Sequence, residues 1–301
     1  MKTWIMLAAI VLTFGAASGA FAGSSVFTPP LSAQLAPTPS PEAAGPAPGA
    51  FTGGSDWLAG WDVSLDGRVG VPSGSVRVGE KPVKGTELGL HNDLGMAVSE
   101  VLEASLGYHL TPRDAIRLTY LQYFLNGSTT INQSFTYNGQ FYDPGRVTSS
   151  LGFNWLSLAY ERVLFALPNG GSLTGSAGVR YVSLDAVVRG NHEDFYRQEL
   201  PVPIVGLRLI YPIDQRWALT ADVSGGGLPR VDSLRQEGGT VYLNQTHADG
   251  GVSLTYAITP TLQAHAGYHL TYFLQHEKSH EDDNRFELID NGLQFGLNFR
   301  F

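Results

Sequence analysis

Apolar and polar residues alternate strictly along the last eleven residues of the chain, NGLQFGLNFRF. Because successive side chains of a β-strand point to opposite faces, this pattern predicts a strand with one apolar and one polar face. The apolar face carries Leu293, Phe295, Leu297, Phe299 and Phe301. The same period of two recurs upstream in four segments: VLEASLGYHL (101–110), RWALTADVS (216–224), GVSLTYAI (251–258) and TLQAHAGYHLTYFL (261–274).

The connections between such segments alternate in length. The short ones are 111–114, 167–171, 212–215 and 259–261, and the long ones fall near 72–97, 126–148, 189–200, 225–248 and 275–287. Strands of about ten residues with apolar outer faces and this loop asymmetry are typical of transmembrane β-barrels with short periplasmic turns and long outer loops. We therefore predict an all-β fold, a transmembrane antiparallel up-and-down β-barrel of about ten strands: 57–71, 98–110, 115–126, 149–165, 172–189, 200–212, 216–225, 249–258, 261–274 and 288–301.

Aromatic residues at the strand ends beside the short turns also indicate a membrane protein. They are Tyr108, Phe165, Tyr211, Trp217 and Phe299. Such residues form a girdle at the interface between lipid and water. A soluble β-sandwich would alternate as well, but it explains neither the girdle nor the loop asymmetry.

The N-terminal part of the chain has a different composition. Residues 1–22 combine a charged Lys2, an apolar stretch and a small-residue cleavage site, which predicts a secretory signal peptide. Residues 23–56 are rich in proline and alanine and predict an extended linker without a core, before a barrel domain at 57–301. The chain has no cysteine for a disulfide framework, and its formal net charge of −8 argues against a nucleic-acid partner.

Three stretches resemble a family of Gram-negative outer-membrane β-barrel proteins of undefined activity: GTELGLHNDLGM (85–96), LGYHLTPRDAIRLTYLQYFLNG (106–127) and LPVPIVGLRLIYPIDQRWALTADV (200–223). The chain end, with Leu297, Phe299 and Phe301, is similar to the C-terminal assembly signal of these proteins. The resemblance covers most of residues 57–301 and implies a fold and a location, the cell outer membrane. For a barrel in that membrane we expect outer-membrane lipid, lipopolysaccharide and the barrel-assembly machinery as partners. His91 and Asn92 stand where the family has carboxylates, which weakens any cation-related role of that stretch.

The letters HEKSH (276–280) match the zinc-protease pattern H-E-x-x-H. That pattern functions on a helix, where positions i and i+4 share one face and both imidazoles reach one metal. Here it falls in a predicted outer loop, and along a strand His276 and His280 would lie about 13 Å apart. We interpret the match as a coincidence: His276, His280 and Asp282 are weak metal candidates, and we expect no cofactor.

A second set of residues suggests enzyme chemistry, because Glu103, Ser105 and His109 share one face of a predicted strand. Along that strand Ser105 and His109 lie about 13 Å apart, whereas a nucleophile and its base must be within hydrogen-bond reach. The sequence also shows no pattern of an omptin-type protease or of an outer-membrane lipid deacylase. We therefore predict that the protein is not an enzyme.

The inward, polar phase of the predicted strands carries charges of both signs: Asp62, Glu103, Arg117, Glu161, Arg180, Arg208, Asp222 and Arg300. Interleaved signs in a narrow lumen predict an ion-pair network that plugs it. Counting from the turns pairs Arg117 with Glu161, places Arg180 near Glu161, and brings Arg300 to Asp62. The hydrophobic alternation slips near Gln122 and Leu288, which predicts a change of strand phase there.

These observations favour a structural or surface-interaction role in the outer membrane, with an extracellular ligand that the sequence leaves open. The second hypothesis is a narrow channel for small solutes or ions, and the third is a surface hydrolase that uses the His/acid outer loop. Among the outer loops, FTYNGQFYD (135–143) predicts a protruding hairpin that turns at Asn138-Gly139.

Overall fold

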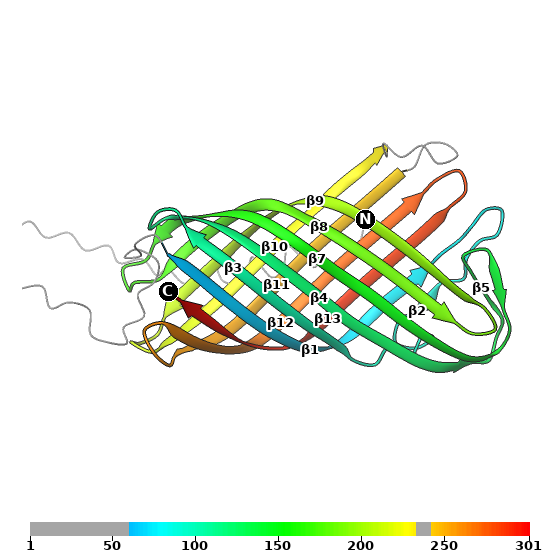
Figure 1. Ribbon diagram of the computed structural model, residues 1–301, viewed down its shortest axis with the longest axis horizontal. Coiled ribbons are helices and arrows are strands. Elements are labelled where there is room, and N and C mark those ends of the chain that lie inside the picture. The colour runs from blue at the N-terminus through cyan, green and yellow to red at the C-terminus, as the bar shows by residue number, and fades with distance from the viewer. Residues whose placement is uncertain (1–59, 233–241) are drawn as a thin grey trace, which may run out of the picture. The chain divides into compact units, whose positions relative to one another are not determined.

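The computed structural model describes residues 60–232 and 242–301, so the predicted signal peptide (1–22) and linker (23–56) lie outside the described residues. Within this part of the chain, ten long strands form a closed antiparallel barrel (Figure 1). They are β1 (Trp61–Arg77), β3 (Ser99–His109), β4 (Asp114–Ile131), β7 (Gly145–Ala166), β8 (Ser172–Arg189), β9 (Glu193–Pro212), β10 (Trp217–Asp232), β11 (Tyr242–Ala257), β12 (Leu262–Lys278) and β13 (Asp283–Arg300). No helix that could span a membrane occurs in the described ranges.

Each long strand pairs with the one before and after it, and the last closes on the first. The register of β1 against β13 runs from Asp62 opposite Arg300 to Arg77 opposite Arg285. The predicted all-β, up-and-down barrel of about ten strands is therefore confirmed. Three short strands belong to the outer connections: β2 (Leu88–Gly89), β5 (Phe135–Tyr137) and β6 (Gln140–Tyr142).

Several strands are much longer than predicted, and the extra length lies at their outer ends. β7 has 22 residues and β4 has 18, whereas about ten residues suffice to cross the hydrocarbon core. Two predicted long loops are in fact tight hairpins, because β9 begins four residues after β8 ends at Arg189, and β13 begins five residues after β12 ends at Lys278. About half of the barrel wall thus extends beyond the membrane.

The side-chain alternation does not slip at Gln122 or Leu288, so the predicted change of phase is wrong. Gln122 points outward between inward Leu121 and Tyr123, and the strand continues in the same phase. Leu288 points inward in an unbroken series with Phe286. What changes at this height is polarity, because the inner face becomes apolar and the outer face becomes polar.

A hydrophobic core fills the outer half of the barrel. It includes Leu121, Tyr123, Leu125, Leu151, Phe153, Trp155, Val182, Leu184, Phe273, Phe286 and Leu288 from the wall. The connection between β1 and β3 adds Leu88, Leu90, Leu94 and Met96 to this core. The stretch GTELGLHNDLGM is therefore a plug segment whose apolar residues enter the barrel, whereas His91 and Asn92 are exposed in a turn closed by the Asp93 carboxylate on the Gly89 amide (2.7 Å).

The segment 135–143 forms the expected hairpin, with positive φ at Asn138 (49°) and Gly139 (74°) as a type I′ turn requires. It does not protrude, however, but folds against the outer end of the barrel, opposite the C-terminus in Figure 1. Tyr137 is fully buried and donates its hydroxyl to the Ala186 carbonyl (2.9 Å). The hairpin buries three aromatic side chains, Phe135, Tyr137 and Tyr142. Burying this apolar surface is more favourable than leaving it in water, so the segment caps the barrel.

Candidate functional site: the closed lumen

Arg117 on β4 is the centre of the polar network at the periplasmic end of the lumen. It donates to Asp62 on β1 (Nη1 to Oδ1, 2.7 Å) and to Glu161 on β7 (Nε to Oε1, 3.0 Å). Asp62 also binds His109 (2.9 Å), and Glu161 also lies 3.4 Å from Arg208. One guanidinium thus bridges two carboxylates on opposite sides of its own strand.

Glycine makes this arrangement possible on the strand between Arg117 and Asp62. Gly107 on β3 lies between them in the register, opposite Asp62 on one side and Arg117 on the other. A Cβ atom at Gly107 would collide with the Asp62 carboxylate and approach the Arg117 guanidinium to 3.0 Å. The absence of a side chain lets the two charges meet across the strand.

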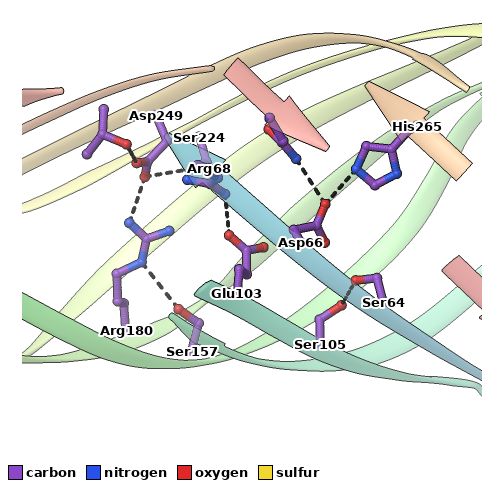
Figure 2. A network of polar contacts seen from close by, with 12 residues as sticks. Ser64, Asp66, Arg68, Glu103, Ser105, Ser157, Arg180, Ser224, Asp249 and His265 are labelled. Carbon is purple, nitrogen blue, oxygen red and sulfur yellow. Dashed lines mark hydrogen bonds and ion pairs between the residues drawn. The ribbon is translucent and has the colours of Figure 1, made fainter. Parts of the chain in front are cut away.

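A second layer of ion pairs lies deeper in the lumen, and Figure 2 shows it from close by. Arg68 pairs with Glu103, and Asp66 binds His265 (2.5 Å) and accepts a hydrogen bond from Gln294 (3.1 Å). These groups come from neighbouring strands β1, β3, β12 and β13. These ion pairs and hydrogen bonds thus lie where the last strand, β13, closes on the first, β1.

Arg180 on β8 was expected near Glu161, but it binds Asp249 instead (2.7 Å). Asp249 lies on β11, so this ion pair spans the lumen rather than joining neighbouring strands. The Arg180 guanidinium also lies 4.1 Å from the ring centroid of Trp155, a cation–π contact at the boundary with the apolar core. The long arginine side chain therefore reaches across the barrel at the height where lumen polarity changes.

The two remaining predicted lumen residues, Asp222 and Arg300, both lie on the inner face but differ in their charged neighbours. Arg300 lies directly opposite Asp62 in the register of β13 and β1. Asp222 lies opposite Arg208, yet no cation comes within 4.0 Å of its carboxylate among the described residues. Asp222 is therefore open to the lumen.

An aromatic layer closes the lumen above these ion pairs. Phe153 lies at its centre, with ring centroids 4.6 Å from Phe273, 5.3 Å from Trp155 and 5.3 Å from Tyr123. Phe153 and Phe273 are both fully buried. Below this layer the lumen holds a cavity of about 280 Å³ that extends from the turn at Pro112 and Arg113 to His269.

The HEKSH letters span the end of a strand and a tight turn rather than a helix. His276 is on the outer face of β12, where it binds Asp283 (3.2 Å), and Asp282 accepts a hydrogen bond from Ser279 (3.2 Å). His280 lies in the turn between β12 and β13. In residues 60–232 and 242–301, no group of three or more potential ligands has a geometry that could hold a metal ion.

The triad-like residues of β3 each have a different partner. Glu103 binds Arg68, the Ser105 hydroxyl lies 2.6 Å from the Ser64 hydroxyl, and His109 binds Asp62. The structure therefore does not bring them together as acid, nucleophile and base.

The outer surface of the periplasmic half is apolar and ends in aromatic residues. Leu297, Phe299 and Phe301 of the predicted assembly signal are about half exposed on this surface. The predicted girdle residues Tyr108 and Trp217 are also exposed, and each packs against a second aromatic ring, of Trp61 (4.6 Å) and Tyr256 (4.7 Å) respectively. An apolar band with an aromatic rim is the surface that a lipid bilayer requires.

Comparisons with known proteins bear on the fold. The sequence matches no known family model and no curated protein sequence. The outer-membrane protease OmpT from Escherichia coli is similar in structure, with a TM-score of 0.53 and 14% identity over 82% of this chain and 100% of that one. The chain has the fold of an outer-membrane β-barrel.

Two further solved structures are similar at lower TM-scores. The translocator domain of the autotransporter NalP from Neisseria meningitidis has a TM-score of 0.40 and 13% identity, over 82% of this chain and 90% of that one. Ail from Yersinia pestis has a TM-score of 0.33 and 11% identity, over 81% of this chain and 100% of that one. At such identities the likeness to OmpT concerns the fold of the barrel alone.

Sequence reasoning missed the aromatic layer, although a signal for it was present. In β7 the residues Leu151, Phe153 and Trp155 continue the same inward phase as Ser157 and Glu161. Where the outer wall passes from lipid into water, the inner face becomes apolar. These three residues therefore mark the height at which the barrel leaves the lipid.

Proposed function

We propose that this barrel is a non-conducting outer-membrane protein with a structural or surface-interaction role. The observation that carries the proposal is the aromatic layer around Phe153, which fills the outer half of the lumen. A hydrated ion that crossed this layer would lose its water without gaining polar partners, which costs several kcal/mol or more. The polar network below adds a second barrier. Because the aromatic layer is separate from that network, closure does not depend on the ion pairs alone.

We also propose that the barrel is not an enzyme. Glu103, Ser105 and His109 are engaged with three separate partners, and His276 of the HEKSH letters binds Asp283. Neither set has the mutual contacts that nucleophilic or metal-assisted hydrolysis needs.

The outer end supports a role in interaction with a ligand outside the cell. Two of its connections are packed rather than loose, because the hairpin β5–β6 and the plug segment 85–96 are anchored in the core. A packed platform loses little conformational entropy when a partner binds to it. We propose lipid and lipopolysaccharide as the partners of the apolar band, and the barrel-assembly machinery as the partner of the last strand with Phe301.

Recordings in planar lipid bilayers test the proposal. We expect no steady current from the wild-type protein, and none from Arg117→Ala, because the aromatic layer remains in place in that variant. Heat-modifiable migration on gels verifies that each preparation contains folded barrel. A stable, ion-selective conductance of the wild type would support the channel hypothesis instead, and current that appears only in Arg117→Ala would place the seal in the ion pairs.

A further inference from the structure

The strand register forms one row of inward positions at the deep end of the polar cavity. From β9 to β13 the row reads Arg208, Asp222, Gly251, His269 and Gly292. Gly251 leaves the position beside His269 without a side chain, whereas at Gly292 the backbone of β1 at Val69 and Gly70 comes too close for one. Asp222 and His269 are therefore separated by one strand that has no side chain at this height.

Asp222 and His269 both face the open position at Gly251. A Cβ atom at Gly251 would lie 3.1 Å from Oδ1 of Asp222 and 3.1 Å from Nδ1 of His269. His269 is 93% buried, since its exposed fraction is 7%, yet neither of its ring nitrogens has a hydrogen-bond partner within the described part of the chain. Buried polar atoms are nearly always hydrogen-bonded, so the two ring nitrogens of His269 indicate that the space beside them accommodates a polar ligand.

The two charged groups beside this space, the Asp222 carboxylate and the Arg208 guanidinium, do not form an ion pair with each other. The Asp222 carboxylate has no cation within 4.0 Å among residues 60–232 and 242–301, although Arg208 is its direct cross-strand neighbour. Arg208 turns toward Glu161 at 3.4 Å, and its side chain is 40% exposed to the cavity. A guanidinium has five N–H donors, so Arg208 keeps donors for a second acceptor.

We propose that this part of the cavity binds a small zwitterion that carries an ammonium and a carboxylate group, such as a free α-amino acid. The Asp222 carboxylate and the neutral ring nitrogen of His269 accept hydrogen bonds from the ammonium. The Arg208 guanidinium binds the carboxylate, for which its planar fork is well suited. A cation alone would leave the remaining donors of Arg208 unused, and an anion alone would leave Asp222 without a donor.

Cavity size and access agree with such a ligand. The volume of about 280 Å³ falls below the usual range for drug-sized ligands, so it suits a molecule of a few heavy atoms. The cavity wall includes Pro112 and Arg113 of the turn between β3 and β4, so the site is reached from the periplasmic end. This inference goes beyond the proposed surface role and holds whether or not a partner binds outside.

Isothermal titration of the detergent-purified full-length protein tests the inference, with L-alanine as the probe. L-alaninamide, which lacks the carboxylate, and propionate, which lacks the ammonium, are the matched half-ligands. We expect L-alanine to bind, and each half-ligand to bind at least about tenfold more weakly, a difference of about 1.4 kcal/mol. Absence of L-alanine binding, or equal binding of L-alaninamide or propionate, would overturn the zwitterion site.

Variants at the site locate the binding. Asp222→Asn and Arg208→Gln should each weaken L-alanine binding at least about tenfold, whereas Asp185→Asn on the outer face of β8 should leave it unchanged. Gly251→Ala keeps every charge and fills the space between Asp222 and His269, so it should also abolish binding while the barrel still folds. Wild-type affinity in Gly251→Ala, or equal losses in Asp222→Asn and Asp185→Asn, would refute the assignment.

Discussion

The membrane half and the outer half of this barrel are built from the same strands with opposite polarity. In the membrane half of β7 the outward residues are Leu156, Leu158 and Tyr160, and the inward ones include Ser157 and Glu161. In the outer half the outward residues include Asn154, and the inward ones are apolar, as at Phe153. The alternation is continuous, so the surrounding solvent decides which face is apolar.

This comparison shows that two different physical effects hold the two halves together. In the outer half, water surrounds the wall, and burial of apolar surface stabilises the interior as in a soluble protein. In the membrane half, lipid surrounds the wall, so apolar side chains gain nothing by pointing inward. The lumen there depends on ion pairs such as Arg117 with Asp62 and Glu161, whose charges must be matched because the space is confined.

The largest effect is expected in the apolar half. Phe153→Ala removes a fully buried ring from the centre of the aromatic layer and should lower the free energy of unfolding by about 3–5 kcal/mol. Urea titration of the refolded protein in detergent micelles measures it. The control is Asn154→Ala, the next residue of β7 on the outer face, and equal losses in the two variants would contradict an apolar core at this height.

Loss of Arg117 tests the polar half in the same way. Arg117→Ala leaves Asp62 and Glu161 without their shared cation in a confined lumen, which should cost about 3 kcal/mol of stability. Arg162→Ala is the matched control, because Arg162 and Asp114 form an exposed ion pair at the same end of β7 (3.4 Å). A loss in Arg117→Ala no greater than in the control would show that water, not ion pairing, satisfies these charges.

A charge placed on the outer face locates the boundary between the halves. Leu158 lies in the apolar band, with Leu118 and Val179 beside it, so Leu158→Arg should destabilise the barrel in lipid by about 2–4 kcal/mol. Asn154→Arg, four residues further along the same face, should have almost no effect because that position faces water. Similar costs at both positions would mean that the lipid reaches higher than the change in polarity indicates.

The smallest effect concerns the outer hairpin between β12 and β13. Burial would raise the pKa of Asp283, but the hydrogen bond with His276 and the charge of Arg77 outweigh it and lower that pKa below its usual value. Its stabilisation is therefore present at neutral pH and is lost as the pH falls through the lowered pKa. Asp283→Asn should reduce stability at pH 7 by less than about 1 kcal/mol.

Thermal unfolding at neutral and at strongly acidic pH measures this effect. The difference between wild type and Asp283→Asn should vanish in acid, where the carboxylate of the wild type is protonated as well. Glu281→Gln in the same hairpin serves as the control. A difference that persists unchanged in acid would rule out the charge of Asp283 as its cause.

The sequence alone was sufficient for the membrane half but not for the outer half. A strand that crosses lipid has an apolar outward face, so the hydrophobic pattern predicts the strands and the short turns. With these in place, counting from the turns predicts that Arg117 lies beside Glu161 on the neighbouring strand. The partner of Arg180 could not be predicted, because Asp249 lies across the lumen and its distance depends on the barrel diameter.

The sequence predicts long outer loops near 126–148, 189–200, 225–248 and 275–287, but the strands extend into all four. The reversed polarity of the outer half hides these strand ends, because their outward positions are not apolar. Outward Gln122 and inward Leu288 continue the geometry of their strands but not its hydrophobic pattern. The hairpin at Asn138-Gly139 was recognisable from its turn residues, whereas its burial depends on contacts with Val78 and Ala186, which are remote in sequence.

Thiol reactivity on one strand tests the central claim most directly, because the chain has no cysteine of its own. Thr174 and Ala186 both point inward from β8, the first into the polar cavity and the second into the apolar core. In the folded protein, Thr174→Cys should react with a small hydrophilic maleimide nearly as fast as in the unfolded chain. Ala186→Cys should react only as fast as the barrel unfolds. Equal, rapid reaction at both positions would contradict an outer half closed by an apolar core.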